Sequence, residues 1–304
     1  MTTVVCVGIA VLDHLFQVDE LPAGEGKFYA GGYREVGGGV AANAAAAVVK
    51  LGGTARYVGR VGADRTGERI TADLAALGVD VSAVESVDGV VSPVSAVLVD
   101  RAGERLIVNH TPSDLFTGGP VDRAARIDGA DAVLVDVRWP AGAVAALAAA
   151  QAAGIPSVFD FDRPMVGGGE GIIGIASNVV FSRDALAATA GTTDVAAGLA
   201  RVRERTPAWL AVTTGGDGVW WLDDDGTHHQ EAFPVDVVDT VGAGDVFHGA
   251  FALALGEGRS EPEAVEFATA AAAIKCSRPG GRNGAPNRDE VERLLRGGLQ
   301  WPLG

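Results

Sequence analysis

The sequence predicts an α/β fold with a mostly parallel central sheet and a second, smaller β-sheet that stands apart from it. Short apolar runs rich in β-branched residues alternate with alanine-rich runs of helical length, which is the pattern of βαβ units. The strand-like runs are residues 4–11, 55–61, 132–137, 157–161, 179–181 and 209–213. The helix-like runs are residues 41–51, 70–77, 142–153 and 194–205. We therefore expect a parallel sheet that helices cover on both faces.

Four glycines are each expected to follow a helical run. The four glycines are Gly52, Gly78, Gly154 and Gly191. Glycine adopts the left-handed conformation of a helix C-terminal cap more easily than any other residue, so these positions support the helix predictions. After Pro234 the pattern becomes helical, with apolar periodic runs at residues 243–255, 261–275 and 289–295.

Two segments, residues 14–36 and 91–111, interrupt the alternation of strands and helices. Their apolar residues recur at every second position, and a turn at residues 100–103 divides the second segment. We expect them to form a small antiparallel sheet inserted into a single domain that spans residues 1–304. Because an exposed sheet leaves open edges, something must cover it. The expectation is a lid over a substrate cleft, or a contact with a second subunit in a homodimer.

Composition excludes several classes of protein. Among the 304 residues, 24 are Lys or Arg and 39 are Asp or Glu, so the formal net charge is −15. Such an acidic chain is a poor binder of nucleic acid or of an anionic membrane surface. Cys6 and Cys276 lie too far apart for a zinc ribbon or a disulfide framework, and both are expected as buried thiols. The apolar start lacks a basic region before it, and residues 141–153 are too short to span a bilayer, so a cytoplasmic protein is expected.

The segment from Asp239 to Phe247 is the strongest candidate for chemistry. Its small residues Gly242, Ala243 and Gly244 precede an apolar periodic helix. Backbone N–H groups at a helix N-terminus have no intrahelical partner and lie at the positive end of the dipole, so they can bind an anion such as a phosphoryl group. Asp245, in the first helical turn, can accept a proton from an attacking hydroxyl. The alternative is a plain turn followed by a helix-capping carboxylate.

A second candidate segment runs from Gly37 to Asn43 and opens a helix. Backbone N–H groups near Gly38 and Gly39, together with the Asn43 amide, can hydrogen-bond a polyol. Tight helix packing is the alternative for these glycines. The spacing G-x-G-x-x-G and the P-loop pattern are both absent, and Asp13 stands where a dinucleotide-binding enzyme would carry its glycine fingerprint.

In this order, these segments resemble the PfkB, or ribokinase-like, family of carbohydrate kinases over nearly the whole chain. The resemblance rests on the strand ending in Asp13, the stretch through Asn43, the split lid, residues 213–218 and residues 239–245. It implies a ribokinase-like three-layer α/β/α sandwich with a small β-sheet lid. It also implies an ATP- and Mg²⁺-dependent sugar phosphotransferase.

The resemblance assigns a role to each matching residue. Asp245 matches the catalytic base, and the N–H groups of Gly242, Ala243 and Gly244 match the anion hole. Sugar hydroxyls are implied to bind Asp13, Gly38, Gly39 and Asn43, while Thr214, Gly216 and Gly218 match the loop at the nucleotide phosphates. A monovalent cation such as K⁺ is implied near Asp239 and the carbonyls of Val241 and residues 277–284. Many members carry Asn-x-x-Glu for the magnesium water shell, whereas this chain reads Phe181-Ser182-Arg183-Asp184, which leaves Asp184 as the acidic candidate.

Within the family, residues 35–39, 136–139, 235–240 and 275–282 are most similar to sulfofructose kinases. The implied reaction phosphorylates the 1-hydroxyl of 6-deoxy-6-sulfofructose. A sulfonate is a fully ionised acceptor with three oxygens, and Lys27, Asn109 and Arg138 fall where they can donate to it. Solvated surface charge is the alternative for Lys27 and Arg138, and a turn role for Asn109. Arg278 and Arg282 are expected to be structural or to influence nucleotide binding.

Other substrates and one other class of protein stay open at this point. Fructose, fructose 6-phosphate and tagatose 6-phosphate are alternative ketose substrates. A sugar-binding regulator without turnover is the non-enzymatic alternative. The loss of Asn-x-x-Glu is its only support, and the complete segment from Asp239 to Asp245 speaks against it.

Overall fold

A mixed eight-stranded sheet forms the centre of the molecule in the computed structural model, which describes residues 1–117, 121–162 and 171–297. Its strand order is β14-β13-β12-β11-β10-β9-β1-β4, and all neighbours from β12 to β4 are parallel. The pairings of β12 with β13 and of β13 with β14, at one edge, are antiparallel. The bounds are β1 Thr3–Val7, β4 Thr54–Val58, β9 Ala132–Asp136, β10 Ser157–Phe161, β11 Asn178–Ser182, β12 Trp209–Thr213, β13 Val219–Asp223 and β14 Gly226–Gln230. The predicted α/β class with a mostly parallel sheet is confirmed.

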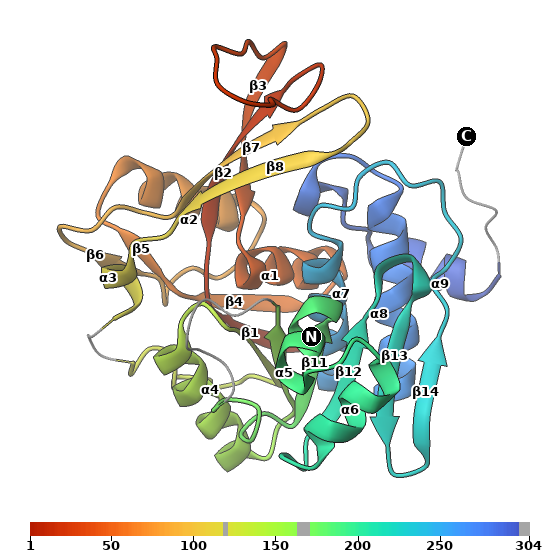
Figure 1. Cartoon of the computed structure of the whole chain (residues 1–304). Coiled ribbons are helices and arrows are strands. Elements are labelled where there is room, and N and C mark those ends of the chain that lie inside the picture. The colour runs from red at the N-terminus through yellow and green to blue at the C-terminus, as the bar shows by residue number, and fades with distance from the viewer. Residues whose placement is uncertain (118–120, 163–170, 298–304) are drawn as a thin grey trace.

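Helices cover both faces of this sheet, as Figure 1 shows. One apolar core joins the sheet to α1, α7, α8 and α9, and the other joins it to α4, α5 and α6. The helices of the first face are α1 Val40–Lys50, α7 Ala243–Gly256, α8 Glu261–Cys276 and α9 Arg288–Leu295; those of the second are α4 Pro140–Ala153, α5 Arg183–Ala190 and α6 Val195–Arg203. Further elements are α2 Arg65–Ala76, α3 Ser113–Phe116, and the short strands β5 Arg60–Gly62 and β6 Glu85–Val87, of which α2 and β5 add residues to the first core. The structure is therefore the expected α/β/α sandwich.

The second sheet has four strands in the order β3-β2-β7-β8 and rises above the central sheet (Figure 1). Its strands are β2 Val11–Gln17, β3 Gly32–Gly38, β7 Val94–Val99 and β8 Arg105–His110. The prediction of an antiparallel sheet is wrong in one respect, because β2 and β7 pair in parallel. The physical reason is the connection: β3, α1, β4 and α2 lie between the two strands, which is long enough for a parallel crossover. We call this sheet the lid.

The predicted first strand, residues 4–11, divides into β1 and β2 at Gly8. A Cβ atom at Gly8 would lie 2.1 Å from Oδ2 of Asp136, so only glycine fits where the chain leaves the central sheet for the lid. The four helix-terminating glycines all have positive φ, between 66° and 87°, which confirms the predicted helix ends. Cys6 is buried as expected, whereas Cys276 is partly buried. In the described ranges, no helix combines the length and apolar character needed to cross a membrane.

Candidate active site

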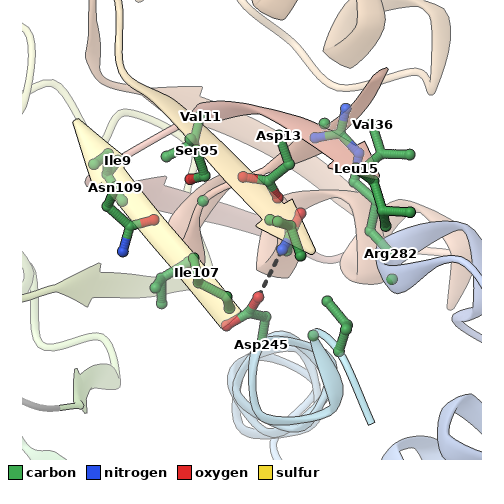
Figure 2. Close-up of a pocket in the computed structure, with 18 of the residues that line it drawn as sticks. Ile9, Val11, Asp13, Leu15, Val36, Ser95, Ile107, Asn109, Asp245 and Arg282 are labelled. Carbon is green, nitrogen blue, oxygen red and sulfur yellow. Dashed lines mark hydrogen bonds between the residues drawn. The ribbon is translucent and has the colours of Figure 1, made fainter. Parts of the chain in front are cut away.

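A cavity of about 450 Å³ lies between the inner face of the lid and the N-terminus of α7. Because side chains alternate along a strand, every second residue of the lid faces this cavity. Figure 2 shows Asp13, Ser95 and Asn109 from three different lid strands, with Asp245 below them. The remaining polar or glycine lining residues are Arg34, Gly37, Gly39, Asn43, Thr111, Arg138, Asp239, Gly242, Gly280, Gly281 and Arg282.

Asp245 lies in the first turn of α7 and lines the cavity. Gly242 caps this helix in the left-handed conformation, with φ 72°. A Cβ atom built on Gly244 meets no atom within 4 Å, so open space adjoins the helix N-terminus. The Ala243 N–H group donates to the carbonyl of Thr240 at 3.2 Å, so this one of the predicted anion-hole amides already has a partner. The arrangement fits an anion beside a carboxylate that can accept a proton.

Asn43 holds the Asp245 carboxylate from the opposite side of the cavity floor. Its Nδ2 donates to Oδ2 of Asp245 at 2.6 Å, and its own Oδ1 is buried without a partner in the described structure. Burial and the nearby Asp160 carboxylate raise the pKa of Asp245 to about 7. A carboxyl with this pKa exchanges its proton near neutral pH, which suits a general base.

Beneath this carboxylate, His248 forms a buried pair with Asp160, which the sequence reasoning did not identify. Its Nδ1 lies 2.7 Å from the Gly244 carbonyl oxygen and 2.9 Å from Oδ2 of Asp160. Burial alone would lower the pKa of His248, but Asp160 holds it above its usual value. Nothing in the local spacing could reveal this pair, because Asp160 lies on β10 and His248 lies on α7.

The three consecutive glycines Gly37, Gly38 and Gly39, at the end of β3, each make room for a different group. A Cβ atom at Gly37 would lie 1.7 Å from Nη2 of Arg282, and one at Gly38 would lie 2.2 Å from Oδ2 of Asp13. Gly39 caps α1 with φ 96°, against the backbone of Ile9. Gly38 itself is buried and does not line the cavity, so its contribution is to let Asp13 face the cavity.

Arg282 reaches the cavity, contrary to the expectation that it is structural or belongs to the nucleotide side. Its side chain rises from η2, Gly281–Gly284, toward the lid near Val36 (Figure 2). Arg282 is only 5% exposed, and within the described ranges no carboxylate lies at salt-bridge distance from it. Burial lowers the pKa of Arg282, and Asp73 and Asp13 act against this at longer range. The sequence does not reveal this position of Arg282, because the 277–284 loop reaches the cavity only by folding back across α1 and β3. Arg278, by contrast, forms a salt bridge with Glu290, as expected of a structural residue.

The structure brings together only part of the predicted sulfonate site. Asn109 and Arg138 both line the cavity. Arg138 Nη2 lies 3.7 Å from Oδ2 of Asp162, and the Arg138 backbone N–H donates to Asp136 at 2.8 Å. Lys27 is exposed in the long loop between β2 and β3 and is not among the lining residues. Arg282 is therefore the buried cation of this cavity that Lys27 was expected to supply.

The predicted nucleotide loop lies at the C-terminal end of β12, outside the cavity. Thr214 is buried and bonds through both its N–H and its hydroxyl to the Gly218 carbonyl, each at 2.8 Å. Gly216 is exposed, and a Cβ atom there meets no atom within 4 Å. Arg183 reaches this loop and bonds to Asp217 at 2.5 Å, while Asp184 lies exposed in the first turn of α5.

The residues around Asp239 do not fit a separate monovalent cation. An ionised carboxylate offers about four lone-pair positions to donors. Asp239 receives the N–H groups of Val241, Gly280 and Gly281 at 2.8, 2.9 and 3.3 Å, and the Lys275 ammonium at 3.4 Å. Burial alone would raise the pKa of Asp239, but these donors hold it below its usual value. Within the described residues, no group of three or more His, Cys, Asp or Glu side chains is arranged to hold a metal ion.

Comparisons with known proteins agree over nearly the full chain. The family model described as pfkB family carbohydrate kinase matches residues 1–288. An ATP-dependent ribose-1-phosphate kinase of Halopiger xanaduensis is 32% identical over 296 residues, which cover 97% of this chain and 98% of that protein. A crystal structure of a candidate ribokinase from Agrobacterium tumefaciens superposes with a TM-score of 0.92 at 41% identity, covering 99% of each chain. The Arabidopsis thaliana ribokinase solved with ribose and ATP has a TM-score of 0.80 at 26% identity, covering 97% of this chain and 98% of that one.

Proposed function

The chain belongs to the pfkB family of carbohydrate kinases, and we propose that it is an ATP-dependent kinase of an anionic ketose. The proposed substrate is 6-deoxy-6-sulfofructose, phosphorylated on its 1-hydroxyl. The observation that carries this proposal is a single cavity that holds both a carboxylate poised at a helix N-terminus and a buried guanidinium without a carboxylate partner among the described residues. The first group suits phosphoryl transfer, and the second suits a negatively charged substituent on the sugar.

In the proposed reaction, the 1-hydroxyl oxygen of the ketose attacks the γ-phosphorus of ATP. A new O–P bond forms while the bond from the γ-phosphorus to the bridging oxygen of ADP breaks. Asp245 takes the hydroxyl proton, and Asn43 holds that carboxylate in place through its 2.6 Å hydrogen bond. The free N–H groups of the first turn of α7 stabilise the charge on the transferring oxygens. The lid keeps water away from the phosphoryl group.

The nucleotide is proposed to bind beside the cavity, at the loop that contains Thr214, Gly216 and Gly218. The open space over Gly216 supports this placement, because a phosphate can approach the backbone there. Mg²⁺ bound to ATP supplies charge neutralisation on the phosphates. Asp184, at the start of α5, is the acidic side chain proposed to orient its water shell.

The anionic substituent of the substrate is proposed to meet Arg282, with Arg138 and Asn109 as further donors. Asp13, which also lines the cavity, is proposed to bind sugar hydroxyls instead. Ser95 lies opposite Asp13 in the pairing of β2 with β7, and both residues line the cavity. One relative acts on ribose 1-phosphate, which is also an anionic sugar. A sugar phosphate is therefore the second candidate substrate.

ADP release with Mg-ATP tests these alternatives. We compare 6-deoxy-6-sulfofructose, ribose 1-phosphate, fructose 6-phosphate and fructose at equal low concentration. A strong preference for sulfofructose is the expected result, whereas a preference for ribose 1-phosphate would replace the substrate and keep the anionic site. Turnover of fructose alone would overturn the anionic site.

Substitution of Arg282 tests the same site independently. Arg282→Gln is expected to lower kcat/KM for the anionic substrate by about 10- to 100-fold, the value of a charge-assisted hydrogen bond, and to change fructose turnover little. Arg34→Gln is the matched control, because Arg34 also lines the cavity but is exposed. Equal losses in the two variants would contradict a specific role for Arg282.

We also propose that the chain forms a homodimer through the outer face of the lid. The outer face carries exposed apolar side chains, with Tyr33 56%, Leu106 40% and Val108 60% exposed. A second copy of the same face would bury them, because a twofold contact matches a surface with itself.

A further inference from the structure

Lys275 lies in the last turn of α8, and its side chain is completely buried. A lysine is almost never fully buried unless its charge is paired. Its Nζ donates to the backbone carbonyl of Asp239 at 2.5 Å and lies 3.4 Å from both the Arg278 carbonyl and Oδ2 of Asp239. The ammonium group therefore has three oxygen partners, one of them charged.

These oxygen partners belong to the two loops that border the site of phosphoryl transfer. Asp239 begins the loop that leads to Gly242 and Asp245, and Arg278 begins the loop that leads to Arg282. The Asp239 carboxylate also accepts N–H groups from both loops. Val238 and Asp239 further donate their N–H groups to the Cys276 carbonyl, which follows Lys275 directly. One buried positive charge thus joins the two loops at the helix N-terminus where an anion is proposed to bind.

We propose that the Lys275 ammonium is a built-in cation of the active site and takes the place of a bound monovalent metal ion. Carbonyl oxygens and a carboxylate are the ligands that a potassium ion would use, and here they are already engaged by a covalently held charge. The lysine keeps the two loops at a fixed separation and offsets the negative charge of Asp239. Turnover and folding then require no potassium.

If so, neither the turnover nor the stability of the protein depends on which monovalent cation is present. The activity measurement rests on the proposed kinase function, but thermal unfolding does not. We therefore measure both kcat and Tm in potassium, ammonium, sodium and choline chloride at equal ionic strength. Wild-type values are expected to agree among the four salts. A rise of Tm or kcat that is specific to potassium and ammonium would overturn the proposal.

Two substitutions of Lys275 separate the effect of charge from that of volume. Lys275→Ala removes the charge and leaves space that a cation can enter, whereas Lys275→Met removes the charge and fills the space. Both variants are expected to lower Tm in choline by roughly 10 °C, because an uncompensated buried charge remains. Potassium or ammonium is expected to restore Tm and kcat of Lys275→Ala, at least in part, but to leave Lys275→Met unchanged.

Lys50→Ala is the matched control. Lys50 donates to the backbone carbonyls of Asn283 and Ala285 at 2.5 and 3.3 Å, at the far side of the same loop, but it is partly exposed. Water can replace it, so this variant is expected to acquire no dependence on potassium. Absence of potassium rescue in Lys275→Ala, or the same rescue in Lys50→Ala, would overturn the proposal. If kcat is absent in every protein while Tm shows the predicted pattern, the kinase proposal fails and the built-in cation stands.

Discussion

At the scale of the residue, the chemistry of this site depends on how single charges are partnered. Among the described residues, Asp245 has one side-chain hydrogen-bond donor, Asn43, and it lies near the buried Asp160 carboxylate, so burial and repulsion raise its pKa to about 7. Asp239 has four donors, and its pKa lies below the usual value despite burial. Two aspartates six residues apart therefore have opposite characters. One can exchange a proton and the other is a fixed anion.

Asp245→Asn tests the proposed base. The amide keeps the shape of the side chain and can still accept the Asn43 hydrogen bond, but it cannot take a proton. We expect kcat to fall by about 10²- to 10⁴-fold, with little change in the far-ultraviolet circular dichroism spectrum. Near-normal turnover of Asp245→Asn would rule out this residue as the base.

The pH dependence of kcat/KM tests the same carboxylate without a substitution. The raised pKa means that Asp245 is protonated, and inactive as a base, below about pH 7. We therefore expect kcat/KM to rise with pH through this region and then to level. A profile that is flat from about pH 5 to pH 8 would contradict the assignment.

At the scale of the element, each strand of the lid serves two surfaces. Along β8, Ile107 and Asn109 line the cavity, while Leu106 and Val108 face away from it. Arg105, at the start of the same strand, donates a hydrogen bond to the Thr240 hydroxyl in the loop before α7. A change in the position of the lid is therefore coupled to the loop that carries the proposed anion site.

A charge on the outer face of the lid tests the proposed dimer. Val108→Asp places a carboxylate at the centre of the apolar contact, so we expect a shift from dimer to monomer in sedimentation velocity. Val144→Asp is the control, because Val144 is an exposed apolar residue on α4, on the other side of the molecule from the lid (Figure 1). A monomeric wild-type protein at working concentration would remove the dimer proposal.

At the scale of the whole molecule, two buried carboxyl groups, Asp136 and Asp245, lower the stability of the fold at neutral pH. The pKa of Asp136 is raised to about 6 and that of Asp245 to about 7, mainly by burial. A carboxyl whose pKa is raised in the folded state binds its proton more tightly there than in the unfolded chain. Its contribution to the free energy of unfolding is therefore lost as pH rises from about 4, its unfolded value, to the folded pKa.

Asp245→Asn is expected to change how the stability of the fold depends on pH. The variant lacks the ionisation, so its Tm is expected to exceed that of the wild type above about pH 7, and the two values are expected to converge near pH 4. Differential scanning calorimetry across this range measures the difference. A variant less stable than the wild type at pH 8 would show that the carboxylate stabilises the fold instead.

The sequence by itself determined the periodic features of this protein and indicated the candidate sites that lie within one continuous segment. The alternation of strands and helices, the glycine stops and the segment from Asp239 to Asp245 depend on neighbours along the chain, so their residue types reveal them. Only the tertiary structure decided which distant segments meet. The parallel pairing of β2 with β7, the His248–Asp160 pair, and the positions of Arg282 and Lys275 all follow from contacts between residues far apart in the chain. Whether a cationic side chain is solvated, as Lys27 is, or buried against carbonyl oxygens, as Lys275 is, depends on which surface folds over it, and no local pattern contains that information.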